Sequence, residues 1–418
     1  MSGADMPLPP SALSRLRHLL AAIGPGLVVM LADTETGSVI AAAQSGAHWG
    51  YRMLPLLLLL IPFLYLVQEL TIRLALGTGL SYGELVRRRW GRRAERASAA
   101  LLLVSCLGAL ATQLSGLAGV GQMFGIPAWR TMTLLCALIF AMVCSGGYRS
   151  VERVAIGLGV FELAFLAEAW LARPDPGQML AQLSGLPLGN HDFLLLAAAN
   201  IGTCVMPWTI CYQQSALLDK GLTLADLRPA RLDTLLGAIL CQAITAGILI
   251  AAAVAFGNGA GGQSLDTIPE IAGGFDRLLG PTGGRLMFAL ALSGGALVAT
   301  IVVCLSSAWT LGELAGRRDS LEKRPLQAPW FYGGFAAMLI GAGALVSSGV
   351  NLVKLSIATS VANALLLPAM LAGLYWLAGG DALPPPLRLS RRYKMMLAPL
   401  LLLAAGFSLY AGIAGSLD

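Results

Sequence analysis

The stretch MLADTETGS, residues 30–38, decides how this chain folds, because it places two acids in the middle of an otherwise apolar run. Asp33 and Glu35 are two residues apart, so a continuous α-helix would point them roughly 200° away from each other. At least one charged side chain would then face lipid or unrelated packing, which is costly. An unwound segment avoids this cost by turning both carboxylates and several backbone carbonyls toward one cavity. The sequence therefore predicts a helix that is interrupted near its middle.

A second interruption is predicted in the stretch IGTCVMPWTICYQQ, residues 201–214. Pro207 has no amide hydrogen and disrupts the helical turn before it, which frees carbonyl groups near Thr203. The two interruptions fall in the first and sixth predicted spans, the corresponding members of two five-helix halves. Transporters built from inverted repeats bind their substrate between such paired broken helices. The two halves show no convincing residue-level repeat, so the predicted symmetry is one of position.

The composition is typical of a membrane protein with many helices. Of the 418 residues, 56% are hydrophobic and 12% are charged, whereas an average soluble protein carries about 25% charged residues. The mean hydropathy is +0.73, and the 50 glycines suit helices that pack closely in a bilayer. The net charge of +6 comes from short Lys and Arg clusters between apolar runs, which argues against nucleic-acid binding. The seven cysteines form no C-x-x-C pair, so neither disulfides nor a zinc site is expected.

Eleven apolar stretches are long enough to cross a bilayer core, which needs about 20 helical residues. Their predicted bounds are 18–44, 53–78, 98–123, 130–147, 153–172, 193–216, 233–256, 284–313, 329–348, 352–378 and 395–415. These spans predict an N-terminal cytoplasmic segment, a first five-helix repeat, an extracellular loop, a second five-helix repeat, and a basic loop with the eleventh helix. The corresponding bounds are 1–17, 18–172, 173–192, 193–378 and 379–418.

The Lys and Arg residues predict the orientation of the spans, because short cytoplasmic loops are enriched in both. Of the 28 Lys and Arg residues, 21 fall on one side of the predicted membrane. The N-terminus is therefore predicted in the cytoplasm and the C-terminus outside, as expected for a multi-pass protein of a bacterial inner membrane. The run RRRWGRR, residues 87–93, is interpreted as a topology anchor, with an anionic-lipid or nucleic-acid site as the alternative.

Five further charged residues lie within predicted spans, where an ionisable side chain usually marks a transport pathway or a structural pair. Glu69 and Arg73 are four residues apart on one helical face and are predicted to form a structural ion pair. Glu162, Glu168 and Glu313 stay open between a structural and a transport role. Glu168 and Glu313 lie near predicted span ends, where we expect water to solvate them.

Four stretches resemble the Nramp family of divalent-metal transporters. They are GPGL at 24–27, QSGAHWGYR at 44–52, FGIP at 124–127 and IGTCVMPW at 201–208. Similar spacing extends over most of the chain and is strongest in the first six spans. The resemblance implies an all-α, LeuT-like fold with inverted five-helix repeats and discontinuous helices 1 and 6. It implies a transporter rather than an enzyme, and the sequence shows no nucleophile and base pair at motif spacing.

The resemblance also implies which residues contact the metal ion. The family's first-span motif Asp-Pro-Gly-Asn falls on residues 35–38, so Glu35 takes the place of the metal-binding aspartate. Asp33 is an additional acid without a counterpart in the family. The implied contacts are the side chains of Asp33, Glu35 and Ser38, the carbonyls of Ala32 and Thr203, and the sixth-span methionine, Met206.

The departures from the family pattern share one chemical theme, because groups that accept protons are missing. The residues that line the implied site or replace its proton pathway are Trp208 and Gln213 at two histidine positions, Gln113 near the third-span acids, and Ser360 at a tenth-span glutamine. The three histidines, His18, His48 and His191, lie outside these motifs and receive no role. The pattern resembles the Nramp-related magnesium transporters, a branch not thought to couple Mg²⁺ to protons.

The chemistry of the implied ligands favours Mg²⁺, with one exception. Mg²⁺ prefers six oxygens and keeps several waters, so one or two carboxylates beside hydroxyl and carbonyl oxygens suit it. Met206 points the other way, because a thioether suits softer ions such as Mn²⁺, Fe²⁺ or Cd²⁺. We expect hydrated Mg²⁺, and also Mn²⁺, beside a methionine that packs without ligating. No cofactor is expected; the expected partners are divalent ions and the lipid bilayer.

The expected mechanism is alternating access without proton coupling. A divalent ion gains about 4.6 kcal/mol per 100 mV of membrane potential on entering the cell, so uptake needs no proton partner. Two alternatives stay open. One is a proton-coupled Mn²⁺/Fe²⁺ transporter of the main Nramp branch. The other is a sodium-coupled amino-acid symporter of the same fold, although paired acids would repel an amino-acid carboxylate.

Overall fold

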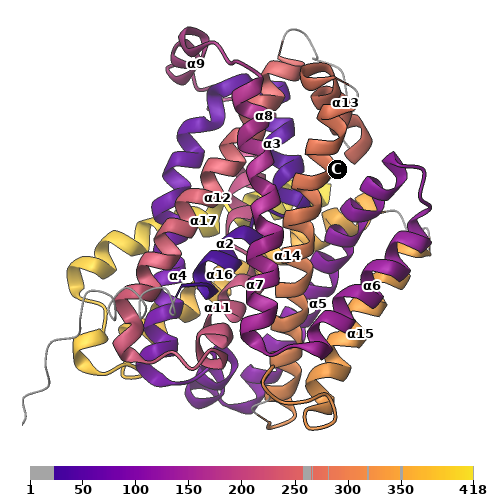
Figure 1. Ribbon diagram of the computed structural model, residues 1–418. Helices are drawn as coiled ribbons and strands as arrows, with labels where there is room; N and C mark the ends of the chain where they lie inside the picture. The colour runs from indigo at the N-terminus through magenta and orange to yellow at the C-terminus, as the bar shows by residue number, and fades with distance from the viewer. Residues whose placement is uncertain are drawn as a thin grey trace, which may run out of the picture.

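The computed structural model describes residues 23–257, 265, 267–280, 282–317, 320–348 and 352–417, with backbone alone at 352–362, 364, 365, 408 and 411–417. Every regular element in these residues is helical (Figure 1). The bounds are α2 Pro25–Ala32, α3 Thr36–Trp49, η1 Gly50–Met53, α4 Leu54–Thr78, α5 Tyr82–Met123, α6 Ala128–Ser145, α7 Tyr148–Gly159, η2 Val160–Glu162, α8 Leu163–Leu171, α9 Pro176–Leu183, α10 His191–Cys204, α11 Pro207–Asp219, η3 Leu224–Asp226, α12 Leu227–Phe256, α13 Ile268–Leu279, α14 Gly283–Leu314, α15 Pro329–Ser347, α16 Leu352–Gly379, η4 Pro385–Leu387 and α17 Arg391–Leu417. The predicted segment 1–17 and His18 lie outside the described residues.

Eight helical segments of the described chain are long and apolar enough to cross a membrane. The first of them, Thr36–Thr78, joins the second half of predicted span one to predicted span two, and the other seven coincide with spans three to nine. The first half of span one falls on α2, and spans ten and eleven fall on α16 and α17. The chain is therefore an all-α, multi-pass membrane protein, as its composition indicates. Two shorter helices, α9 and α13, lie in loops for which the sequence predicted no element.

The two predicted interruptions are confirmed. After α2, Asp33 keeps helical angles but Glu35 is extended (φ −77°, ψ 172°), and α3 begins at Thr36. After α10, Val205 (φ −134°, ψ 114°) and Met206 (φ −109°, ψ 153°) are extended, and Pro207 begins α11. In Figure 1, α2 lies near the middle of the bundle, with α3 above it and α11 below it.

The helix α5 starts well before the predicted bound of 98. Ser81 caps it, because the Ser81 hydroxyl accepts from the Glu84 amide at 3.3 Å and the Glu84 carboxylate accepts from the Ser81 amide at 3.1 Å. The first two turns end at Gly91, whose φ of 87° is not helical. This conformation favours glycine, since a side chain is strained there. The basic run 87–93 therefore bends in its middle.

Glycines allow helices to approach the interrupted first span closely. A Cβ atom on Gly295 of α14 would lie 2.2 Å from the Thr34 carbonyl oxygen, between α2 and α3. A Cβ atom on Gly46 of α3 would lie 2.2 Å from the Leu249 carbonyl oxygen of α12. Such distances exclude any side chain, so small residues let α12 and α14 enclose the unwound segment.

The predicted ion pair is confirmed and extended. The Arg73 guanidinium lies 2.6 Å from the Glu69 carboxylate, and Arg231 of α12 also donates to that carboxylate. The Tyr393 hydroxyl of α17 donates to Glu69 at 3.2 Å. One buried acid thereby joins α4, α12 and α17. All seven cysteines are free in this structure.

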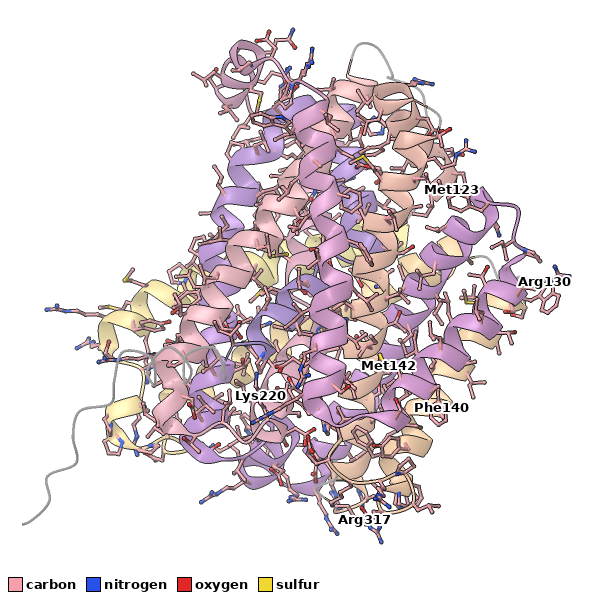
Figure 2. The ribbon with its side chains drawn as sticks, viewed as in Figure 1. Met123, Arg130, Phe140, Met142, Lys220 and Arg317 are labelled. Atoms are coloured by element: carbon pink, nitrogen blue, oxygen red, sulfur yellow. The ribbon has the colours of Figure 1, made fainter. Side chains whose placement is uncertain are left out.

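The expectation that water solvates Glu168 is wrong. Its side chain is fully buried, because α8 packs against α12 and α14. Glu313 is partly exposed near the end of α14, as expected. Figure 2 places Lys220, which follows α11, and Arg317, which follows α14, toward the lower end of the bundle, and Met123 far from that end. This arrangement agrees with the predicted alternation of loops; the assignment of the lower end to the cytoplasm stays a prediction.

Candidate metal site at the two helix breaks

The end of α2 presents backbone oxygen at the first break. The last amides that bond back into this helix are Asp33, to the Val29 carbonyl at 3.2 Å, and Thr34, to the Leu31 carbonyl at 3.1 Å. The carbonyl of Ala32 lies beyond these bonds, where a continuing helix would have supplied its amide partner. The predicted carbonyl ligand therefore sits at the open end of a helix.

Glu35 is held from the opposite side of the break by α5. Its carboxylate accepts a hydrogen bond from the Gln113 side-chain amide, and the Gln113 oxygen accepts from the Thr36 amide at 3.0 Å. Glu35 is 4% exposed and occupies the N-cap position of α3, where the helix favours negative charge. Gln113, predicted to replace an acid of the proton pathway, thus fixes both the carboxylate and the start of α3.

Asp33 is buried without such support. It is 1% exposed, and neither carboxyl oxygen has a hydrogen-bond partner in the described residues. The carboxyl group lies within electrostatic range of Glu35 and of the thiols of Cys204 and Cys241. A buried carboxylate with no partner is costly, so this position suits a cation that would compensate it.

The second break meets the first at Thr203. A Cβ atom on Gly37 would lie 3.0 Å from the Glu35 carboxylate and 3.9 Å from the Thr203 methyl carbon. Thr203 is in the last turn of α10, whose carbonyls lose their amide partners where the backbone becomes extended. Ser38 is buried in the first turn of α3. The structure thus brings α3 and the end of α10 together at Glu35.

The other predicted residues of the sixth span are buried in α11. Met206, at its N-cap, is 3% exposed, and its carbonyl accepts from the Thr209 amide at 3.1 Å. Trp208 is fully buried, and its carbonyl accepts from Ser306 of α14 at 3.2 Å. Gln213 bonds elsewhere: its side chain accepts from Thr71 of α4 and donates to Thr234 of α12. These hydrogen bonds connect α11 to α4 and α12, and neither of them involves Asp33 or Glu35. Ser360 lies in α16, but its side chain is outside the described residues.

Two acids that the motif analysis left aside contact the first span. Glu162, at the end of η2, is fully buried with its carboxyl group facing Thr34. The Cβ position on Gly295 that meets the Thr34 carbonyl also lies 3.5 Å from the Glu162 carboxyl carbon. The sequence did indicate a special role for Glu162, because it is an acid within a predicted membrane span.

The second of these acids, Asp233 of α12, accepts from the Gly24 amide at 3.0 Å and the Gly26 amide at 2.7 Å. The start of α2 is also held by Lys220, whose ammonium donates to the Ile23 carbonyl at 2.7 Å. The same ammonium pairs with Glu152 of α7 at 2.9 Å, with both side chains less than 10% exposed. Asp233, Lys220 and Glu152 form what we name the α2 latch. Nothing in the sequence singled out Asp233, because it is the first residue of a predicted span and a charged residue is common at a span end.

The exposure of the site is uneven between its two sides. Gly37 and Thr203, on the side of α3 and α10, are partly exposed. Trp208 and Tyr212 of α11 are buried, and so is α2 except for Leu27. The partly exposed residues near Glu35 therefore lie on the side of α3 and α10, whereas the side of α2 and α11 is buried.

Two broken helices that meet at the centre of a membrane-spanning helical bundle are the arrangement of the LeuT-like transporter fold. The solved manganese transporter of Eremococcus coleocola has this fold: one of its variants is similar with a TM-score of 0.81 and 18% identity, covering 98% of this chain and 90% of that one. The structure of MhsT in complex with L-phenylalanine is similar with a TM-score of 0.63 and 17% identity, covering 96% and 98%.

The chain belongs to the Nramp family. The family described as natural resistance-associated macrophage protein-like matches residues 26–414. A relative named divalent metal cation transporter MntH, from Chromohalobacter salexigens, is 31% identical over 310 residues, covering 68% of each chain. Another of the same name, from Verminephrobacter eiseniae, is 27% identical over 379 residues, covering 86% of this chain and 81% of the relative.

Proposed function

We propose that this Nramp-family protein imports hydrated divalent cations, Mg²⁺ first and Mn²⁺ also, by alternating access and without proton coupling. The observation that carries the proposal is the position of Asp33. This carboxyl group is buried, has no hydrogen-bond partner in the described residues, and lies within electrostatic range of Glu35. Two neighbouring buried acids repel each other, and a doubly charged cation compensates both.

The donor set supports an ion that keeps part of its water. No three His, Cys, Asp or Glu side chains of the described residues come together as a metal-binding group. The proposed protein ligands are the carboxylates of Asp33 and Glu35, with the carbonyls of Ala32 and Thr203 and the hydroxyl of Ser38 nearby. Mg²⁺ is usually held by one or two carboxylates plus water, which fits this set.

Mn²⁺ is supported by a different residue. Met206 is buried at the second break, and its thioether suits softer ions than Mg²⁺. The relatives are named divalent metal cation transporters, and the E. coleocola protein is named a manganese transporter. We therefore propose that Met206 sets how well softer ions compete, while the two acids hold the charge of either ion.

The absence of proton coupling is proposed from Gln113. The side chain that bonds to the Glu35 carboxylate is a neutral amide, which does not exchange a proton with it. The potential alone supplies about 4.6 kcal/mol per 100 mV for a divalent ion. Glu162 is the acid that argues for the alternative, because it is buried beside the first break. Its substitution is therefore an arm of the test.

The proposed cycle follows from the uneven exposure of the site. The ion enters along α3 and α10, where Gly37 and Thr203 are partly exposed. Release requires α2 to move away from α12, which breaks the α2 latch. The segment between α2 and α3 has little regular hydrogen bonding, so it can act as the hinge.

The test is uptake into proteoliposomes that contain a pH dye, at an imposed inside-negative potential. We expect Mg²⁺ uptake with unchanged internal pH. Asp33→Asn and Glu35→Gln should each lower uptake at least tenfold. The matched control is Asp276→Asn, since this acid of α13 bonds to Arg285 at 3.0 Å and lies in the loop between α12 and α14. Met206→Ala should retain Mg²⁺ uptake and reduce competition by Mn²⁺.

Acidification that depends on Mg²⁺ or Mn²⁺ would overturn the uncoupled mechanism in favour of the proton-coupled main branch. If the Glu162→Gln variant then took up metal without acidification, Glu162 would be assigned to the proton path. Equal loss of Mg²⁺ uptake in Met206→Ala and Glu35→Gln would overturn hydrated binding. Sodium-dependent uptake of an amino acid would instead support the symporter alternative, which otherwise rests on likeness of fold.

A further inference from the structure

The basic run 87–93 contributes to a cavity that the transport mechanism does not use. This cavity, of about 410 Å³, lies between the first turns of α5, the end of α16 and the start of α17. Its lining includes Arg88, Arg89, Trp90, Trp376 and Lys394. Arg92 and Arg93 belong to the same run but do not line the cavity, because the chain bends at Gly91.

The cavity carries positive charge that the protein does not neutralise. Arg88 and Arg89 have no hydrogen-bond or ion-pair partner in the described part of the chain, whereas Arg87 pairs with Glu95 at 3.4 Å. The acid in the lining, Asp381, is already paired with Arg388 at 3.0 Å. Two arginines are thus left for an external anion, and the planar guanidinium suits a phosphate group.

Lys394 adds a third, oriented donor. Its ammonium donates one hydrogen bond to the Gly379 carbonyl at 2.9 Å, which fixes it at the end of α16 and leaves two further donors. A Cβ atom on Gly379 would lie 2.8 Å from that nitrogen, so glycine permits the approach. The cavity therefore combines two exposed, unpaired arginines of the described chain with one positioned lysine.

The level of the cavity relative to the membrane is marked by tryptophans. Trp90 and Trp376 stack with ring centroids 6.3 Å apart, and they are 39% and 67% exposed. Trp376 lies in the last turns of the apolar helix that ends at Gly379. Tryptophans concentrate where the apolar core of a bilayer meets the headgroups. The positive cavity therefore opens at headgroup depth.

We propose that this cavity binds the phosphate group of an anionic phospholipid. The arginines and Lys394 supply the donors for the phosphate, and the exposed tryptophan pair lies beside it where the acyl chains begin. Basic pockets at helix ends are a known way for membrane proteins to hold anionic headgroups. A free phosphate has the same oxygen chemistry, but it gains nothing from the tryptophans, so the structure favours the lipid.

The test compares Arg88→Gln/Arg89→Gln with the matched control Arg92→Gln/Arg93→Gln. Both change the same charge in the same short run. Native mass spectrometry counts phosphatidylglycerol bound to each purified protein, with phosphatidylcholine as the neutral lipid and inorganic phosphate as the soluble anion. We expect affinity for phosphatidylglycerol to fall roughly thirtyfold in the first variant and to stay within threefold in the control.

Equal behaviour of the two variants would overturn the proposal, because a topology anchor alone makes all four arginines equivalent. Equal binding of phosphatidylcholine would also overturn it, as would full displacement of the lipid by millimolar phosphate, which would indicate a soluble anion. Wild-type protein supplies a measurement that does not depend on folding of the variant. Its affinity for phosphatidylglycerol should fall as salt rises from 0.05 to 0.5 M, since the contacts are charged and near water.

Discussion

The α2 latch makes a quantitative prediction about opening of the buried side of the site. One oxygen of Asp233 accepts from the Gly24 amide at 3.0 Å and the Gly26 amide at 2.7 Å. A hydrogen bond to a charged group contributes about 1.5–3 kcal/mol, so the pair holds the start of α2 by at least about 3 kcal/mol. Asp233→Ala removes both bonds and leaves two amides without these acceptors.

We expect this loss to appear as faster hydrogen exchange at the start of α2. A change of about 3 kcal/mol corresponds to roughly a hundredfold change in an opening equilibrium. Amide exchange measured by mass spectrometry on peptides that cover residues 23–28 should therefore accelerate by up to that factor. Asp233→Asn retains an oxygen acceptor but no charge, so it should give a smaller acceleration.

The control is exchange in the middle of α14, which is among the most buried parts of the described chain. It should not change in Asp233→Ala, which separates local opening from global unfolding. Asp276→Ala should leave both regions unchanged. Transport should show a higher apparent KM for the external ion, because fewer molecules hold the side of α2 closed.

Less than threefold acceleration at residues 23–28, with the fold intact, would refute the reasoning. It would mean that Lys220 and Glu152 hold α2 by themselves, or that α2 does not open by separating from α12. Equal acceleration in α14 would refute it differently, since the bonds would then support the whole bundle and not a movable segment.

Three more outcomes follow from the packing of the first span and its surroundings. Gly295→Ala should abolish uptake, because its Cβ would lie 2.2 Å from the Thr34 carbonyl oxygen, whereas Gly283→Ala has no atom within 4 Å and should transport normally. Glu69→Gln should lower the free energy of unfolding by about 1.5–3 kcal/mol, measured in denaturant, because it removes the charged acceptor that the partly exposed Arg73 and Arg231 share. Asp33→Asn should raise the melting temperature of the metal-free protein while removing the stabilisation that added Mg²⁺ gives the wild type; a fall in melting temperature would contradict the cost assigned to this acid.

Much of the fold was predictable, because the membrane restricts the chain to helices of a given length. The two breaks were also predictable, each from a local conflict: the i, i+2 spacing of two acids, and Pro207 in an apolar span. The bend at Gly91 could not be predicted from the sequence, because a glycine within a basic run has several possible conformations. The helices α9 and α13 were missed because they are amphipathic or short and lie in loops.

The candidate site was predictable in part. Residues that match a family motif, such as Glu35 and Thr203, lie close together in the structure. Gln113, another motif position, donates a hydrogen bond to the Glu35 carboxylate. Gln213 shows the limit of this reasoning, because a motif position gives no information on which neighbour a side chain will bond. Asp233 shows another, since its role depends on amides more than 200 positions earlier in the sequence. Contacts of that kind exist only after the helices have packed.

The two acids of the first break differ in a way that their spacing alone does not reveal. Glu35 occupies the N-cap position of α3, where the helix favours negative charge by about 0.3–1 kcal/mol, and its carboxylate accepts a hydrogen bond from the Gln113 side-chain amide. Asp33 caps the end of α2, where the free carbonyls disfavour negative charge, and no described group bonds to it. The empty protein therefore supports a negative charge on Glu35 better than one on Asp33. A cation between them gains most from Asp33, so this extra acid, absent from the family motif, contributes more to holding the ion than to holding the fold.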